Sequence, residues 1–197
     1  FGVYGFQDGS WQTEGGLNLS GLTANASALV DVRTSGCNAK PGIGVSQGGS
    51  GTNDIGGGET LVIGLKVASS FVQIGINELN KGQGDASWKA YDANGNLVDS
   101  GTLVSTSSNG SLQSFNISTT TAFKYVALGY SGNQNGYVID SIKYTPADGV
   151  VTETFSYTVQ DNDGDVSNTA TLTLNGKPST TVSPTALLTT EDTDVAL

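Results

Sequence analysis

Apolar and polar residues alternate along many stretches of the chain, and this period of two limits its possible folds more than any other feature. In a strand, every second side chain points to the same face. Val72, Ile74 and Ile76 therefore predict one buried strand face. Three further sets predict strand faces in the same way: Phe115 and Ile117; Val126, Leu128 and Tyr130; and Val138, Ile142 and Tyr144. No stretch has a convincing helical period, so the sequence predicts an all-β fold.

Glycine, asparagine and serine separate these stretches, as turn residues do in antiparallel sheets. The stretch "WKAYDANGNLVDSGTL" is the clearest hairpin, because its Asn-Gly pair favours a tight turn. Asp92, Asn94 and Asn96 have the alternate spacing of metal ligands, but we interpret them as part of this turn. "ETLVIGL" is an apolar run typical of a buried sandwich strand. Strands spaced about 8–12 residues apart predict an antiparallel β-sandwich, jelly-roll-like in form, over residues 1–146.

The pattern changes at "TPADG", and residues 147–176 contain two more alternating stretches. Phe155, Tyr157 and Val159 alternate on the first, and Ala170, Leu172 and Leu174 on the second. Two strands cannot bury a core of their own, so we expect this segment either to dock on the first domain or to be the final hairpin of an immunoglobulin-like module. The Thr- and Ser-rich residues 177–197 are predicted to be a linker that enters a further module. Because the chain starts at "FGVYGF" without Met and stops within "TTEDTDVAL", we expect it to be an internal piece.

The composition excludes several classes of function. Only 13% of the residues are charged, the net charge is -10, and no basic cluster exists to bind nucleic acid or anionic lipid. Acidic loops instead favour hard cations such as Ca²⁺. The chain has no His and one Cys, which rules out an internal disulfide, a Cys/His zinc site and a histidine-based nucleophilic mechanism. The acidic residues cluster as metal ligands do and not as the carboxylate pair of a glycosidase, so we expect that the chain is not an enzyme. No apolar run is long enough to cross a membrane.

The most acidic segment is "DNDGD", in the loop of the C-terminal hairpin. It places Asp161, Asp163 and Asp165 at alternate positions with no basic residue beside them. An EF-hand loop beginning at Asp161 would need Gly and Glu where Val166 and Leu172 stand, so the segment is not an EF-hand. A divalent cation would relieve the repulsion of the three carboxylates. We therefore favour a calcium site over a solvated acidic turn.

A second acidic group lies in the first domain. "TNDIGGGET" holds Asn53, Asp54 and Glu59 among glycines, which let carbonyl and carboxylate oxygens turn toward one centre. Asp140 lies on the otherwise apolar stretch "YVIDSIKY", where a buried carboxylate would need a partner. A calcium ion shared by Asp54, Glu59 and Asp140 is the interpretation we favour. The alternative is that Asp140 caps a loop or pairs with Lys143.

Two loops combine aromatic and amide side chains, which suit either a peptide backbone or sugar hydroxyls. The candidate ligand residues in "GYSGNQNGYVID" are Tyr130, Asn133, Gln134, Asn135 and Tyr137. The candidates in "FQDGSWQTEGG" are Asp8, Trp11 and Gln12. Tryptophan serves both as an interface anchor and as a core residue, so ligand contact and a structural role both stay open. Trp88, within a regular hairpin strand, is interpreted as structural.

Two patterns resemble a known family. "FSYTVQDNDGDVSNTATLTLNG" resembles the closing hairpin of the tandem extender repeats of giant repeats-in-toxin (RTX) adhesins of Gram-negative bacteria, and "TTEDTDVAL" resembles the opening strand of a following repeat. In the first domain, "GGSGTNDIGGGETLVIGL", "VQIGINELN", "ASWKAYDANGNLVDSGTL" and "GYVIDSIKY" occur in an order similar to that of the calcium-dependent, peptide-binding β-sandwich modules of such adhesins.

The resemblance implies a calcium-dependent adhesion module on the surface of a bacterium. Its ligand would be a short peptide, such as the free C-terminus of a protein on another cell, and its neighbours would be further adhesin repeats. A glycan-binding module is the first alternative, and a structural spacer without a ligand is the second.

Overall fold

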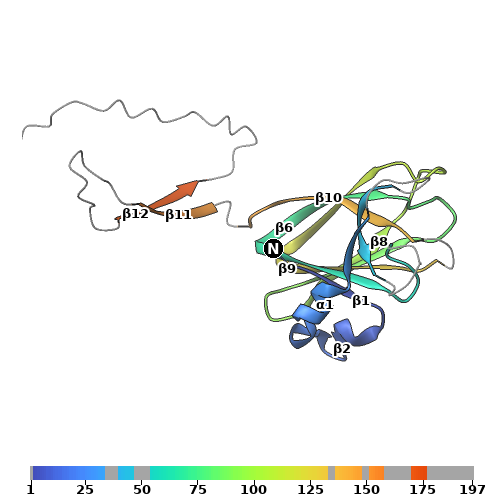
Figure 1. The fold of residues 1–197 in the computed structure, drawn as a ribbon, viewed down its shortest axis with the longest axis horizontal. Helices are drawn as coiled ribbons and strands as arrows, with labels where there is room; N and C mark the ends of the chain where they lie inside the picture. The colour runs from blue at the N-terminus through green and yellow to red at the C-terminus, as the bar shows by residue number, and fades with distance from the viewer. Residues whose placement is uncertain are drawn as a thin grey trace, which may run out of the picture. The chain divides into compact units, whose positions relative to one another are not determined.

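The computed structural model of this chain describes residues 2–33, 40–46, 54–132, 136–147, 151–157 and 170–176. The chain divides into two compact units, Phe1–Asp148 and Gly149–Leu197, at a boundary within the "TPADG" stretch. The described part is mostly antiparallel β-sheet and confirms the all-β, sandwich-like prediction (Figure 1).

The described residues of the first unit form ten strands and three short helices. They are β1 (Gly2–Phe6), η1 (Gly9–Trp11), β2 (Gln12–Thr13), β3 (Gly16–Leu17), η2 (Leu19–Gly21), α1 (Ala24–Ala28), β4 (Val30–Arg33), β5 (Gly42–Val45), β6 (Thr60–Asn77), β7 (Ala86–Tyr91), β8 (Leu97–Leu103), β9 (Gln113–Tyr130) and β10 (Val138–Thr145). The second unit contains β11 (Val151–Tyr157) and β12 (Ala170–Gly176).

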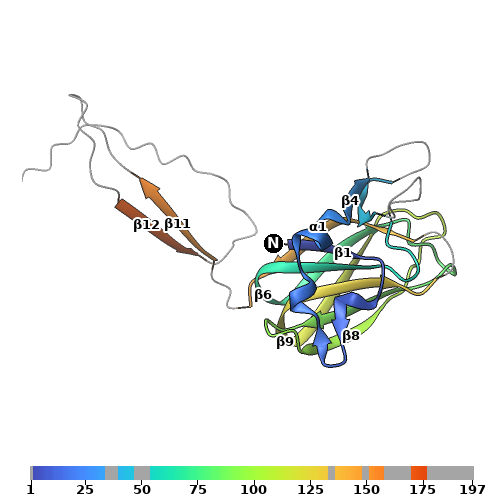
Figure 2. The same cartoon turned by 60° about the horizontal axis from the view of Figure 1, so that its bottom comes forward.

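The two longest strands, β6 and β9, pair antiparallel along most of their 18 residues. The register shifts between Gly64 and Phe71, so the paired strands have two halves. The first half of β6 pairs with β1 and the second half with β10, in the sheet order β4-β5-β10-β6-β9-β7-β8. One continuous sheet therefore supplies both layers of the sandwich (Figure 2).

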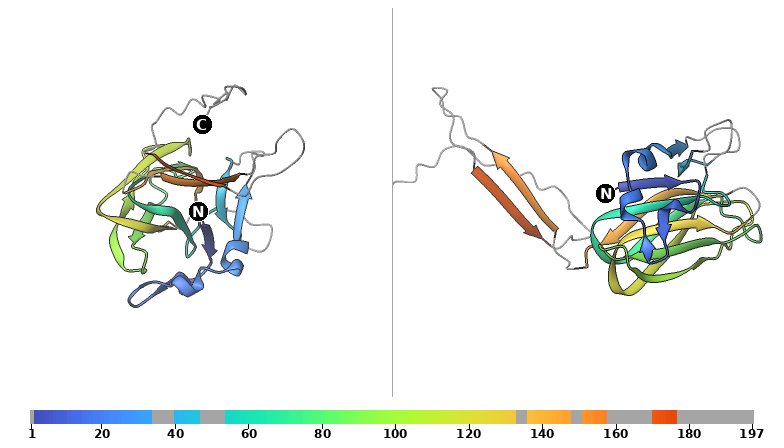
Figure 3. Two further views of the ribbon diagram at one scale, coloured as in Figure 1. Left: turned by 90° about the vertical axis from the view of Figure 1, so that its left-hand side faces the viewer. Right: turned by 90° about the horizontal axis from the view of Figure 1, so that it is seen from below.

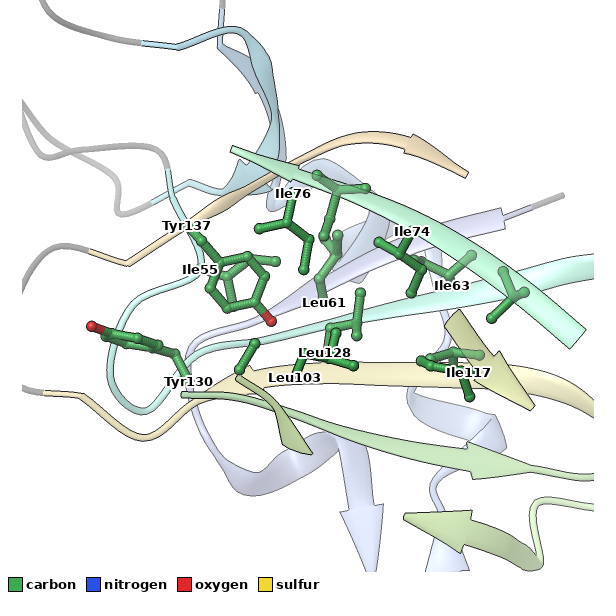
Figure 4. Close-up of a cluster of buried hydrophobic side chains, with 14 of the residues drawn as sticks. Ile55, Leu61, Ile63, Ile74, Ile76, Leu103, Ile117, Leu128, Tyr130 and Tyr137 are labelled. Carbon is green, nitrogen blue, oxygen red and sulfur yellow. The ribbon is translucent and has the colours of Figure 1, made fainter. Parts of the chain in front are cut away.

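The main core lies between these two layers and is built mainly from aliphatic side chains. Leu61 and Ile63 from the first half of β6 belong to the same buried cluster as Ile74 and Ile76 from its second half (Figure 4). Leu128 of β9 lies in this cluster and is also fully buried. The alternating faces predicted for residues 72–76, 115–117 and 126–130 all point into this core.

A second, smaller core lies on the opposite face of β6, β9 and β7, which we call the outer face. Val62, Ala127 and Tyr91 project from this face and pack with Phe6 and Leu17 of the N-terminal segment. β1 extends the sheet by pairing antiparallel with β6, and the rest of the N-terminal segment, from η1 to α1, contributes Leu17 and Ala26 to this core (Figure 3). Because both faces of β6 are covered, consecutive residues of "ETLVIGL" are buried, as its unbroken apolar run predicts.

The β7–β8 hairpin has the turn that the Asn-Gly pair predicts. Gly95 has a φ of 85°, a left-handed conformation that suits glycine. The carboxylate of Asp92 accepts hydrogen bonds from the backbone N–H groups of Asn94 and Asn96 and from the Asn96 side chain. The hydrogen bonds from Asn96 hold the pKa of Asp92 below its usual value.

Asp140 interrupts the alternation of β10, and this corrects the predicted strand face. The pairing of β10 with β6 shifts between Ile139 and Ser141, which is a β-bulge at Asp140. Ile139, rather than Val138, therefore joins Ile142 in the main core. An extra residue reverses the side on which every following side chain lies, and the sequence pattern alone does not show it.

The short helix α1 was not predicted. Its N-cap is Thr23, whose hydroxyl oxygen accepts a hydrogen bond from the N–H of Ala26. Residues 24–28 are mostly alanine, which has the highest helix propensity, but they form too short a stretch to show a helical period. Ala26 packs into the smaller core.

The second unit contains the predicted hairpin. β11 and β12 pair antiparallel with a continuous register, from Val151 opposite Gly176 to Tyr157 opposite Ala170. The loop that joins them, and residues 177–197, lie outside the described residues.

Shortening a core side chain tests the position of the main core. Leu61 is 1% exposed, and we expect Leu61→Ala to lower the free energy of unfolding by about 2–5 kcal/mol, because the sheet around it cannot close the cavity. Leu112 is 53% exposed, and the same change there should cost less than about 0.5 kcal/mol. Urea denaturation of both variants measures the difference, and equal losses would contradict this assignment of the core.

Candidate functional site

Three neighbouring strands place small and polar residues side by side on the outer face. Gly129 of β9 lies opposite Thr60 of β6 on one side and Ser87 of β7 on the other. In the next row, Ala127 lies opposite Lys89. A Cβ atom on Gly129 would lie 3.1 Å from the Ser87 hydroxyl oxygen, so the missing side chain leaves a depression beside this hydroxyl group.

This depression is a hollow of about 170 Å³. In addition to the five residues of the two rows, Trp11 and Trp88 line it. Trp88 also packs against the main core, in keeping with its interpretation as structural. Trp11 belongs to the N-terminal segment and therefore forms a wall above the strands.

Local hydrogen bonds fix the position of Trp11. The carboxylate of Asp8 caps η1 by accepting a hydrogen bond of 2.9 Å from the N–H of Ser10. The carbonyl of Trp11 accepts one of 3.0 Å from the N–H of Asn18, whose side chain in turn donates to the carbonyl of Ser10. The Trp11 ring meets the ring of Tyr91 edge to face, at 6.4 Å between centroids. The indole is thus held in place before any ligand arrives.

Lys89 is the charged group at this hollow. Its ammonium nitrogen lies 3.1 Å from the side-chain oxygen of Gln12 and 5.1 Å from the centre of the Trp11 ring. Among the described residues, no carboxylate lies within 4.0 Å of this nitrogen. The ion pair found among these residues, Arg33 with Glu78, does not involve Lys89. The positive charge of Lys89 therefore rests on neutral partners, an amide oxygen and an aromatic ring.

A second hollow, of about 330 Å³, lies against the other side of Lys89. It is lined by residues 12–16 of the β2–β3 hairpin and by Lys89, Tyr91 and Leu97. Glu14 in this hairpin and Leu97 on β8 are both exposed. We call the two hollows, with Lys89 common to both, the outer groove.

The structure separates the candidate ligand residues of the N-terminal loop. Trp11 lines the first hollow and Gln12 the second, and ligand contact by either residue stays a prediction. Asp8 is exposed, but its carboxylate caps η1, and the hydrogen bonds from Ser10 hold its pKa below the usual value. Asp8 therefore supports the position of Trp11 and does not line either hollow.

The second candidate loop is different. Tyr137 is fully buried, and its hydroxyl donates a hydrogen bond of 3.0 Å to the carbonyl of Gly129. Tyr130 is 8% exposed and donates to the carbonyl of Gln83. The two rings meet edge to face at 6.0 Å and both belong to the main core cluster, with Tyr130 at its edge (Figure 4). Full burial leaves the Tyr137 ring no surface for a ligand, whereas ligand contact by Tyr130 stays a prediction. Asn133, Gln134 and Asn135 lie outside the described residues.

Sequence reasoning missed Lys89, Ser87 and Thr60. The signal for the first two was present in "ASWKAY", because a strand that buries Trp88 must turn Ser87 and Lys89 to the other face. The N-terminal segment leaves part of this face uncovered and places Trp11 at its side. No local sequence pattern indicates this arrangement.

The acidic residues of the predicted calcium site in the first unit differ in burial. Asp54 and Glu59 are both buried, and they accept hydrogen bonds from the N–H groups of Gly136 and Gly56. Asp140 at the bulge is exposed, and its carboxylate accepts a hydrogen bond of 3.4 Å from the Asn77 side chain. A metal partner for Asp140 was expected on the condition that its carboxylate is buried, and this condition is not met.

No three acidic side chains among the described residues are placed to hold a metal ion. Calcium needs six to eight oxygen ligands, so a complete site would require oxygens from residues beyond the described ones. Asn53, Asp161, Asp163 and Asp165 all lie outside the described residues. The two calcium sites stay predictions.

No family model matches the chain, and no curated protein matches its sequence. The resemblance to adhesin modules therefore depends on the sequence patterns alone. Within the described residues, no helix has the length and apolar character needed to cross a membrane.

Buried tyrosines make the fold sensitive to alkali. Burial raises the pKa of Tyr91 to about 12 and also raises the pKa of Tyr137, against an ordinary value of 10.0. Above about pH 10 the unfolded chain loses phenolic protons that the folded chain retains, so the free energy of unfolding should fall as the pH rises from about 10 to 12. Urea denaturation at a series of pH values measures this. Tyr91→Phe should make the free energy of unfolding fall less steeply with pH. An unchanged slope would contradict a raised pKa of Tyr91.

Proposed function

We propose that the first unit is a non-catalytic ligand-binding module of an extracellular bacterial adhesin, and that its ligand lies in the outer groove. The observation that carries this proposal is the environment of Lys89, a cation that rests on an amide and an indole beside a hollow. A ligand with a negative group would supply the carboxylate that the described residues do not place there.

What distinguishes Lys89 is its position beside the two hollows. No described lysine forms an ion pair within the described part of the chain, so the lack of a carboxylate partner is common to these lysines. Lys89 lies on a sheet face between Ser87 and Tyr91, where the hydroxyl of Ser87 can donate or accept a hydrogen bond. A charged hydrogen bond to the ammonium would be stronger than a neutral one, so an anionic ligand group would be favoured.

The groove is preformed and suits adhesion by many weak contacts. Its floor is a sheet with a core on both faces, and its wall is fixed by the η1 hydrogen bonds. Little ordering is then required on binding, which reduces the entropic cost. Repetition of a modest affinity over many copies on a cell surface would give strong attachment.

Two classes of ligand are compatible with the proposal. The resemblance implies a peptide, whose free C-terminal carboxylate would lie at Lys89. A glycan is the second candidate, because the groove offers an indole, two hydroxyls and an amide. Under the third alternative, a structural spacer, the groove would bind nothing.

An occluding substitution tests the site. Ser87 is exposed on the floor of the groove, so we expect Ser87→Trp to abolish ligand binding while the free energy of unfolding changes little. Ser118→Trp on β9, also exposed but lining neither hollow, is the matched control and should bind normally. Arrays of glycans and of peptides with free C-termini, screened in millimolar calcium, supply the ligand. Equal binding by Ser87→Trp and the native chain would refute the location.

Calcium is the second part of the proposal, supported by the acidic segments around residues 53–59 and 161–165. Extracellular modules bind calcium at about 10⁻⁴ to 10⁻³ M, so about 1 mM calcium should stabilise the chain by about 0.4–1.4 kcal/mol for each occupied site. We expect melting temperatures in calcium to exceed those in EDTA by a few degrees, and Asp54→Asn to reduce the difference. Identical melting curves with calcium and with EDTA would remove this part of the proposal.

A further inference from the structure

Lys89 lies between two hollows and not at the end of one. On one side are Trp11 and the two hydroxyls of Thr60 and Ser87, and on the other is the hairpin with Glu14. A negative group bound at Lys89 would therefore have room for ligand on both sides of it. This geometry suits a charge within a chain, whereas a terminal carboxylate needs room on one side only.

The floor of the first hollow, formed by β6, β9 and β7, offers side chains and no free backbone edge. β9 pairs with β6 and β7 on its two sides, and β7 pairs with β9 and β8. An extended peptide gains much of its affinity by adding a strand to an exposed sheet edge, which these interior strands do not provide. β8, whose Leu97 lines the second hollow, is the outermost strand in the described sheet order, so this argument applies to the first hollow. Recognition here would come from hydroxyl, amide, ammonium and indole groups, which suit a ligand rich in hydroxyls.

The charges along the groove limit the charge of the ligand. Among the described residues that line the two hollows, Lys89 is the one basic side chain and Glu14 the one acidic side chain. A carboxylate accepts hydrogen bonds and so favours a hydroxyl-bearing, uncharged unit beside it. A densely charged polyanion would meet repulsion from Glu14 and from the net charge of -10.

We propose that the outer groove binds a uronic-acid residue inside a linear glycan, with neutral sugars on both sides. The uronate carboxylate accepts hydrogen bonds from the Lys89 ammonium. One neutral sugar packs against the exposed part of Trp11 and bonds to the Ser87 hydroxyl, and the other bonds to Glu14. This inference deepens the proposed function and depends on the groove being the ligand site.

The probes are oligosaccharides in which a hexuronic acid alternates with a neutral hexose, and the same compounds with each carboxyl group reduced to an alcohol. Titration calorimetry on the full chain in millimolar calcium measures both affinities. We expect carboxyl reduction to weaken binding by about tenfold or more, since it removes a charge-assisted hydrogen bond. Lys89→Gln should weaken binding of the acidic probe by a similar factor, and Lys89→Arg should retain most of it.

A double comparison isolates the contact. Once Lys89→Gln has been made, reducing the carboxyl group should cause little further loss, because both changes remove the same interaction. Lys143→Gln is the matched control, since Lys143 is exposed on β10 and lines neither hollow. It changes the net charge equally and should leave the affinity unchanged.

The outcomes separate the two proposals. Equal affinity for the acidic and the reduced probe, or an unchanged affinity in Lys89→Gln, would overturn the uronate assignment. Peptide binding that Ser87→Trp abolishes, with no glycan binding, would overturn the uronate assignment and uphold the groove. Glycan or peptide binding that Ser87→Trp leaves intact would overturn both, as would failure of the native chain to bind any probe.

Discussion

The antiparallel pairing of β6 with β9 is the interaction on which the rest of the first unit depends. The two strands continue from one layer of the sandwich into the other, so their inward side chains form the main core from both sides. Their outward side chains in the first half pack with the N-terminal segment. A single long pairing thus determines where the N-terminal segment can lie, and with it where Trp11 stands.

Most strands could be predicted because burial on one face imposes a period of two. The faces of residues 72–76 and 126–130 follow directly from this rule. Residues 138–144 do not, because the bulge at Asp140 reverses which alternate residues face the core. A bulge depends on the pairing with the partner strand. The same bulge turns Asp140 outward, which explains how a carboxylate can stand within an otherwise apolar stretch.

The site was harder to predict, since its residues meet only in three dimensions. Tyr130 and Tyr137 had the composition of a binding loop, yet carbonyl groups within reach of their hydroxyls allow both rings to be buried. Trp11, with a similar composition around it, lines the outer groove. The difference lies in tertiary contacts that a sequence pattern does not contain. Strand pairing likewise brings Thr60, Ser87 and Gly129 into one row from distant parts of the chain.

The charge of the chain and the charge of the groove act over different distances. A net charge of -10 repels acidic ligands at long range, but salt screens this repulsion beyond about 8 Å under physiological conditions. At contact, Lys89 attracts a carboxylate while its amide and indole partners compete weakly for the ammonium. A ligand with dense negative charge would meet the repulsion of the whole chain, whereas a ligand with isolated charges meets mainly Lys89. If the proposed groove binds its ligand in this way, the acidic composition would favour sparsely charged ligands over densely charged ones.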